Sequence, residues 1–308
     1  MINLPNKLFE ELKKYIIKRS SKSKHIRYAG GDWPIKDDLL KIALKVPLKK
    51  ATFVEVFGGS GVMSQIIPRD RFPNVIYNDI DRDLVALHMA IKNNPDLLAS
   101  ILSLLPYSRY LHGYMTKNLI GRELGEIIGA TVLFYILSAS FSGEIGSTFS
   151  TTKESRSSSA VRFVSHIAAI YDIARKFKDV VIEQLDFEEL IKKYDSENTL
   201  FYLDPPYLDT ERGESDYYRH GFTLKDVNRL SSILKNVKGY FMIKIDEDNE
   251  TFYKSIPVID RVEIKIKLSM DFVDGEKRRE YKYLVLTNYR VHMTPTQTLF
   301  VRFNQPTS

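Results

Sequence analysis

An apolar segment that ends abruptly in an acidic, proline-rich turn constrains the fold of this chain more than any other feature. In "NTLFYLDPPYLDT", Asn198 to Thr210, a strand-like run meets Asp204, two prolines and Tyr207. Proline has no amide hydrogen, fixes its own φ at about −65° and keeps the preceding residue out of the helical region. The strand must therefore end here, and a stiff loop presents a carboxylate, free carbonyls and an aromatic ring. A plain strand-ending turn is the alternative, because Asp and Pro are common turn residues.

Strands and helices alternate on both sides of this turn. Alternating β and α segments predict a mostly parallel sheet covered by helices on both faces. Between Asn94 and about Lys178 the alternation stops, and helical segments with one polar loop predict an inserted lobe. The expected helices are Arg82 to Lys92 and Thr223 to Lys235, and the expected strands are "ATFVEVF", "NVIYNDI", "DVVIEQL", "TLFYL", "GYFMIKI", "RVEIKIKLSM" and "YKYLVLTNY".

Composition excludes several classes of protein. The 308 residues are 44% hydrophobic and 27% charged, which is ordinary globular usage. The absence of cysteine excludes disulfides and thiol nucleophiles, and the scattered histidines predict no metal site. The longest apolar run, Ile127 to Phe141, is too short for a bilayer span and predicts a buried helix. A charged N-terminus lacks the apolar stretch of a signal peptide, so we expect a cytoplasmic protein.

Positive charge is concentrated in two regions. Residues 1–27 contain eight Lys or Arg and two Glu, and residues 107–178 contain nine basic and five acidic side chains. Basic clusters suit a polyanionic partner because they displace counterions from phosphates. An N-terminal amphipathic helix with a solvated lysine face is the alternative interpretation.

A glycine-rich turn follows the first expected strand. In "FVEVFGGSGVM" the strand ends at Phe57, and Gly59 and Gly61 would let the turn approach a bound molecule. Asp79 ends the second strand 22 residues later, where an acid grips nucleoside ribose hydroxyls. The G-x-G-x-x-G spacing is absent, so a nucleoside without pyrophosphate fits better.

Four stretches together resemble a known enzyme family. "RYAGGD", "FVEVFGGSG", "YNDID" and "DPPY" are similar to motifs of S-adenosylmethionine-dependent amino-methyltransferases, and more narrowly of Dam-type DNA adenine methylases. The resemblance spans roughly Arg27 to Tyr289. It implies an α/β fold with a Rossmann-like methyltransferase sheet covered by helices on both faces, and a mainly helical DNA-recognition lobe inserted. It implies a catalytic S-adenosylmethionine-binding domain (27–93 and 179–308) and a target-recognition domain (94–178). The basic N-terminal helical extension expected at 1–26 from its charge and apolar spacing precedes the region of resemblance.

The resemblance implies a reaction and roles for individual residues. An adenine flipped out of duplex DNA would receive the methyl group of S-adenosylmethionine on its exocyclic amine. Asp204 and the Pro205 carbonyl would accept hydrogen bonds from that amine, Pro206 would stiffen the clamp, and Tyr207 would stack on the base. The implied cofactor contacts are Tyr28, Ala29 and Gly30 along the methionine part, Phe57, Gly59 and Gly61 beneath the cofactor, Asp79 at the ribose and Asp186 at the adenine amine. The expected DNA contacts follow from charge in the insertion instead: Lys153 and Arg156 lie in its polar loop, and Arg109, Lys117 and Arg122 are the alternative if that loop is not the reader.

Some positions depart from the family pattern, and some alternatives stay open. Asp32 stands where the family usually has lysine, so the role of that lysine falls to Lys36, to Arg27 or to no residue. A helix N-cap is an equally good use for Asp186. The short segment "FSGEIGSTFS" does not predict GATC recognition. RNA adenine, DNA cytosine and a catalytically silent nucleic-acid-binding subunit are alternatives to DNA adenine methylation.

The expected partner is duplex DNA, with no membrane and no resident metal. We expect a monomer or a weak dimer in a prokaryotic or viral setting. A companion restriction endonuclease, as in restriction-modification, is left open by the sequence.

Overall fold

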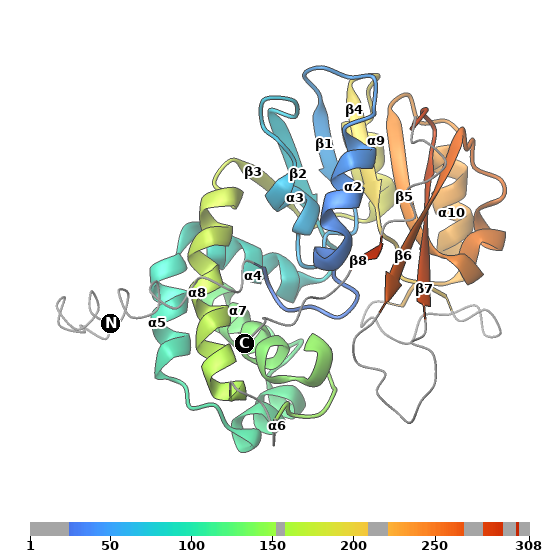
Figure 1. Ribbon diagram of the computed structural model, residues 1–308. Helices are drawn as coiled ribbons and strands as arrows, with labels where there is room; N and C mark the ends of the chain where they lie inside the picture. The colour runs from blue at the N-terminus through green and yellow to red at the C-terminus, as the bar shows by residue number, and fades with distance from the viewer. Residues whose placement is uncertain (1–24, 152–157, 209–220, 268–279, 292–299, 302–308) are drawn as a thin grey trace. The chain divides into compact units, whose positions relative to one another are not determined.

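The computed structural model describes residues 25–151, 158–208, 221–267, 280–291 and 300–301. Contacts divide the chain into two compact units, each described here by itself (Figure 1). Unit 1 comprises residues 1–31, 59–65 and 81–184, and unit 2 comprises residues 32–58, 66–80 and 185–308. No helix within the described ranges is long and apolar enough to cross a membrane.

Unit 2 is built on a sheet with the strand order β2-β1-β4-β5-β7-β6-β8. The first four strands run parallel, β7 is antiparallel to both β5 and β6, and β8 is parallel to β6. The predicted mostly parallel sheet with a β-rich tail is thus confirmed. The strands are β1 (Thr52–Glu55), β2 (Asn74–Asn78), β4 (Thr199–Leu203), β5 (Tyr240–Asp246), β6 (Asp260–Lys267), β7 (Glu280–Thr287) and β8 (Phe300–Val301).

Helices cover the two faces of this sheet. They are η1 (Trp33–Ile35), α2 (Lys36–Ala43), α9 (Phe187–Tyr194), α10 (Leu224–Leu234) and η3 (Glu247–Tyr253). Figure 1 shows α2 in front of the strands and α10 behind them. The Tyr289 hydroxyl, just after β7, donates to the carbonyl of Ile42 in α2 at 3.1 Å.

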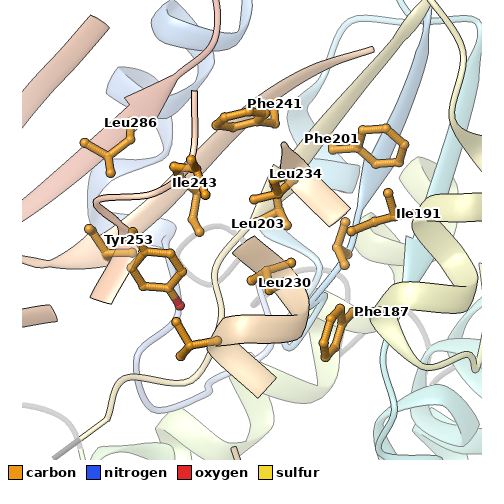
Figure 2. Packing of buried hydrophobic residues seen from close by; sticks show 14 of the residues in the cluster. Phe187, Ile191, Phe201, Leu203, Leu230, Leu234, Phe241, Ile243, Tyr253 and Leu286 are labelled. Atoms are coloured by element: carbon orange, nitrogen blue, oxygen red, sulfur yellow. The ribbon is translucent and has the colours of Figure 1, made fainter. Parts of the chain in front are cut away.

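Successive side chains along the strands point to alternate faces of the sheet. Leu203 of β4 and Ile243 of β5 point into a core formed with Ile191 of α9 and Leu230 of α10 (Figure 2). Because side chains alternate along a strand, Tyr202 and the residues flanking Ile243 point to the opposite face.

Unit 1 is mainly helical, as the interrupted alternation predicted. Its elements are α3 (Val62–Ile66), α4 (Arg82–Asn93), α5 (Pro95–Leu104), α6 (Arg109–Asn118), α7 (Glu126–Ala139), η2 (Phe141–Gly143), α8 (Ser159–Phe177) and β3 (Val180–Glu183). Helix α7 packs against α4, α5, α6 and α8 and is buried from Gly129 to Ala139. The prediction of a buried helix at Ile127 to Phe141 is therefore confirmed.

Candidate active site

The Asp-Pro-Pro-Tyr turn leaves β4 directly and is held at its far end. Asp204 follows the last residue of β4, Leu203. Four residues later, the Leu208 amide donates to Oδ1 of Asn249 at 2.8 Å, and Nδ2 of Asn249 donates to the Leu208 carbonyl at 3.0 Å. Asn249 lies in η3 and is buried. The turn is therefore fixed between a strand and a buried amide, as a rigid clamp requires.

Both carboxylate oxygens of Asp204 have partners. Nζ of Lys244 lies 2.8 Å from Oδ2, and the Tyr207 hydroxyl donates to Oδ1 at 3.0 Å. The Asp204 side chain retains 19% exposure. Since each carboxylate oxygen accepts more than one hydrogen bond, Asp204 keeps capacity for an external N–H donor.

Asp32 and Tyr202 complete a buried polar cluster around Lys244. Lys244 also pairs with Oδ1 of Asp32, and the Tyr202 hydroxyl donates to Oδ2 of Asp32. We name Asp32, Tyr202, Asp204, Tyr207 and Lys244 the Asp204 cluster. Its lysine is Lys244, whereas Lys36 pairs with Asp37 at 2.6 Å. Of the alternatives left open for the role of the usual lysine, Lys36 thus has another carboxylate as its partner.

The surroundings of Asp204 shift its pKa in opposite directions. Burial raises the pKa of the Asp204 carboxyl, Lys244 counteracts that rise, and Asp32 adds to it. Burial disfavours a charge on Lys244, but Asp204 and Asp32 together more than offset this and raise its pKa. Lys244 is therefore an ammonium at neutral pH. The pKa of Asp204 depends on the opposing effects of Lys244, which lowers it, and of burial and Asp32, which raise it.

One buried side chain, Asn78, bonds backbone groups of residues adjacent to predicted cofactor residues of unit 2. Its Nδ2 donates to the carbonyls of Val56 at 2.9 Å and Leu185 at 3.1 Å, and its Oδ1 accepts from the Leu185 amide at 2.8 Å. Val56 precedes Phe57, Leu185 precedes Asp186, and Asn78 itself precedes Asp79. The structure therefore brings these three residues together beyond the carboxyl ends of β1 and β2.

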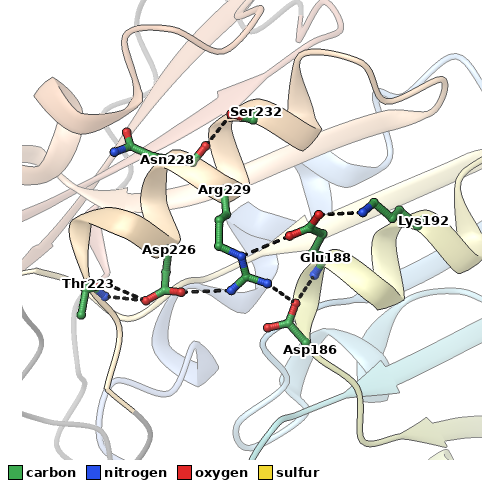
Figure 3. A network of polar contacts seen from close by, with 8 residues as sticks. All are labelled: Asp186, Glu188, Lys192, Thr223, Asp226, Asn228, Arg229 and Ser232. Carbon is green, nitrogen blue, oxygen red and sulfur yellow. Dashed lines mark hydrogen bonds and ion pairs between the residues drawn. The ribbon is translucent and has the colours of Figure 1, made fainter.

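Asp186 also caps a helix, which was the alternative use for this residue. Its Oδ1 accepts from the Glu188 amide at 2.9 Å at the start of α9. The same oxygen accepts from Arg229 of α10 at 2.8 Å, and Arg229 also bonds Glu188 and Asp226 (Figure 3). Both contacts use Oδ1, and Figure 3 shows the other oxygen turned away from the network.

The cofactor residues predicted in unit 1 lie around the glycine turn and the segment before it. A Cβ placed on Gly59 would stand 3.2 Å from the Tyr28 ring, so the two residues lie against each other. The Ala29 amide donates to the Gly143 carbonyl at 3.1 Å, and Gly30 is exposed. A Cβ on Gly61 would stand 2.7 Å from the Phe177 ring, so packing within unit 1 also requires glycine there.

Among the predicted DNA contacts, Arg109, Lys117 and Arg122 are exposed on or just after α6. The Arg109 guanidinium lies 5.1 Å from the centre of the Phe149 ring. Tyr110 and Tyr114, on the same helix, are exposed and stack with ring centres 6.5 Å apart. Lys153 and Arg156 lie outside the described residues, as does nearly all of the predicted N-terminal extension.

Sequence reasoning missed Lys244, Tyr202 and Asn78 as parts of the site. A period-two reading of "YFMIKID" places Lys244 opposite the apolar core, where a lysine normally meets solvent. Asn78 stands beside Asp79 in "YNDID", and an amide at a strand end was the one available signal.

A parallel sheet with acidic groups beyond β2 and an Asp-Pro-Pro-Tyr turn after β4 defines a Rossmann-like methyltransferase. The D12 class N6 adenine-specific DNA methyltransferase family matches residues 28–272, and the chain belongs to this family. No curated protein matches the sequence. Among solved structures, a putative rRNA-methylase from Clostridium thermocellum is similar over 82% of this chain and 97% of its own, with 10% identity and a TM-score of 0.35.

Proposed function

We propose that this protein is a Dam-type, site-specific methyltransferase that uses S-adenosylmethionine to methylate the exocyclic amine of an adenine flipped out of duplex DNA. Membership of the adenine-specific family supports DNA adenine methylation. The observation that carries the finer proposal is the Asp204 carboxylate, held by Lys244 and Tyr207 at the end of β4 with capacity for one more donor.

The chemistry requires that the target amine become a better nucleophile. Its lone pair is delocalised into the adenine ring, so hydrogen bonds to Asp204 and to the Pro205 carbonyl draw the nitrogen toward tetrahedral geometry. As the new C–N bond forms and the S–C bond breaks, the amine becomes acidic and its proton passes to Asp204. The raised pKa of Asp204 suits this transfer, because a general base works best when its pKa lies near the operating pH. In this proposal Tyr207 stacks on the flipped base and Pro206 stiffens the clamp.

The residues present fit S-adenosylmethionine, which supplies the reactive methyl group when bound. Asn78 bonds the backbone of the residues that precede Phe57 and Asp186, and it precedes Asp79 itself. In this proposal the Phe57 ring and the two carboxylates contact the cofactor's adenine ring, its amine and its ribose hydroxyls. Asp79 accepts from the ribose in this proposal, and Asp186 accepts from the cofactor's adenine amine. The remaining contacts proposed for the cofactor are Tyr28, Ala29, Gly30, Gly59 and Gly61.

The helices between residues 94 and 178 form the DNA-recognition domain in this proposal, and 27–93 with 179–308 form the catalytic domain. Exposed basic side chains on and after α6 support a DNA-facing surface there. The proposal includes a monomer or weak dimer that acts in the cytoplasm, with Lys153, Arg156 and residues 1–26 as further basic contacts.

A labelling experiment tests the proposal. The protein is incubated with methyl-tritiated S-adenosylmethionine and separate pools of amplified genomic DNA, total RNA and protein, and the product nucleosides are separated. We expect label in N6-methyladenine from DNA. Label in RNA would indicate an RNA substrate, and label in N4-methylcytosine would indicate a cytosine substrate. Cofactor binding without transfer to any pool would indicate a catalytically silent subunit.

A further inference from the structure

A lysine is buried in the middle of the sheet of unit 2. Lys244 lies in β5 between Ile243 and Ile245, which point into the apolar core, so its own side chain leaves the opposite face. The parallel register pairs Leu203 with Ile243, and the next residues along the two strands are Asp204 and Lys244. Strand pairing therefore brings the lysine beside the acid of the Asp-Pro-Pro-Tyr turn.

Two carboxylates and two aromatic rings surround the ammonium of this lysine. Nζ lies 2.8 Å from Oδ2 of Asp204 and pairs with Oδ1 of Asp32. It also stands 4.9 Å from the centre of the Tyr283 ring and 5.8 Å from that of Tyr207. Lys244 is only 1% exposed. Burying an ammonium at this depth is unfavourable unless it is paired, so packing alone does not account for a lysine here.

Asp32 holds the lysine from the other side. It is buried, and its two oxygens are taken by Lys244 and by the Tyr202 hydroxyl. Its backbone is fixed as well, since the Ile35 amide donates to the Asp32 carbonyl at 3.0 Å at the start of η1. Tyr202 and Leu203 are the last two residues of β4, and Asp204 follows them. The contacts from Tyr202 to Asp32, from Asp32 to Lys244 and from Lys244 to Asp204 therefore begin and end at the same end of β4.

We propose that Lys244 is a positioning residue for methyl transfer, which holds Asp204 ionised and oriented toward the target amine, and that Asp32 with Tyr202 holds Lys244 in place. The inference rests on the proposed function and adds residues to its site. None of the three touches the reacting atoms in this proposal, because each acts through Asp204.

Lys244 and Asp32 carry opposite charges, so substitutions of the two residues should shift the pKa of Asp204 in opposite directions. Lys244 lowers the pKa of Asp204, and Asp32 raises it, although burial is the largest cause of the upward shift. The other ionisable groups near Lys244 or Asp204 are Tyr202, Tyr207, Tyr253 and Tyr283, and these tyrosines stay neutral because burial raises the pKa of each. Removing the lysine charge should therefore raise the pKa of Asp204, and removing the Asp32 charge should lower it.

The test compares pH profiles of kcat for Lys244→Met, Lys244→Arg, Asp32→Asn and the exposed control Lys235→Met. Methyl transfer from tritiated S-adenosylmethionine to amplified genomic DNA is measured from pH 5.5 to 9.5, and cofactor affinity is measured by calorimetry. For Lys244→Met we expect about a hundredfold lower kcat at pH 7 and an acid limb moved up by about one pH unit or more. Lys244→Arg should recover part of the rate. Asp32→Asn should move the acid limb down, while the control and all cofactor affinities stay within about threefold of wild type.

Each outcome has one meaning. Wild-type kcat and an unmoved acid limb in Lys244→Met would overturn the inference, and so would a lower kcat with an unmoved limb, which indicates a packing defect alone. If Lys244→Met fails to fold by circular dichroism, the downward shift in Asp32→Asn decides, and an upward or absent shift there overturns the inference. A wild-type protein that labels no DNA would overturn the proposed function and this inference with it.

Discussion

At the scale of single residues, the site depends on side chains that lie far apart in the sequence. Lys244 meets Asp32 across 212 positions, and Asn78 meets Leu185 across 107. Asp204 is therefore part of a cluster, and its sequence motif contains only some of the residues that contact it. The consequence is that substitutions of Asp204 and of its neighbours should have different kinetic signatures.

Asp204→Ala should lower methyl transfer by about a thousandfold or more, because the amine loses its acceptor and its proton loses its destination. S-adenosylmethionine affinity should stay within about threefold, since the proposed role of Asp204 is toward the target base. Single-turnover transfer and calorimetry on the same preparation measure the two quantities. A rate close to that of the wild type would remove the central claim for the clamp.

Asn78→Ala should weaken both stability and cofactor binding. The substitution leaves the buried Val56 carbonyl and the partly buried backbone groups of Leu185 without their partner, at a cost of about 1–3 kcal/mol in the free energy of unfolding. Phe57, Asp79 and Asp186 lose their common anchor, so we expect S-adenosylmethionine to bind roughly tenfold more weakly, or about 1.4 kcal/mol.

The exposed Asn228→Ala on α10 is the matched control for this prediction and should change neither quantity. Urea unfolding and calorimetry are the measurements. Unchanged cofactor affinity in Asn78→Ala would show that the three residues need no shared anchor.

At the scale of elements, the sequence predicted much of the structure, because local patterns determine it. The apolar run "TLFYL" before the proline turn predicted β4, and the apolar run from Ile127 predicted α7. Thr223 with Asp226 marks the start of α10 through a capping box. Which elements become neighbours is a different question. The burial of Lys244 follows from strand order and register, which no local pattern in "YFMIKID" contains.

The glycine turn after β1 also has a structural role that the sequence pattern did not predict. The sequence indicated a close approach to a bound molecule, whereas the structure also shows a requirement from packing. Gly61 has φ +66°, and an added Cβ would stand 2.7 Å from Phe177 and 3.0 Å from His88. Both the backbone conformation and the available space therefore favour glycine, independently of any ligand.

Gly61→Ala should lower the free energy of unfolding by roughly 1–3 kcal/mol without cofactor, because the strained φ and the contact with Phe177 add. Gly129→Ala, near the start of α7, is the control. No atom lies within 4 Å of its added Cβ, so alanine should raise stability by about 0.5–1 kcal/mol through helix propensity. Urea unfolding followed by circular dichroism measures both. Equal effects of the two substitutions would contradict the packing argument.

At the scale of the whole molecule, charge placement indicates how DNA binds. The chain carries a formal net charge of +6, and the first 27 residues alone hold eight basic side chains against two acidic ones. Charge of this kind attracts any phosphate backbone and reads no bases. Specificity must therefore come from another part of the molecule, and in our proposal it comes from the region of 94–178 that includes α6.

Lys117 offers a clean test of a phosphate contact in that region. It is exposed on α6, and no ring or carboxylate contact of its side chain is found among the described residues, whereas Arg109 also packs over Phe149. Lys117→Ala should weaken binding to short fluorescent duplexes of unrelated sequence by the same factor. The slope of log K against log salt should become shallower by about 0.9, the value for one phosphate contact.

The exposed Lys225→Ala on α10 removes the same charge outside the proposed recognition domain and should leave both the affinity and the slope unchanged. A base contact would behave differently, because it would relax the preference at one position of the site by about 1–3 kcal/mol. If Lys117→Ala and Lys225→Ala change the slope equally, DNA is attracted by total charge alone and α6 is not part of the binding surface. If neither changes it, while deletion of residues 1–24 does, the phosphate contacts belong to the basic N-terminal segment.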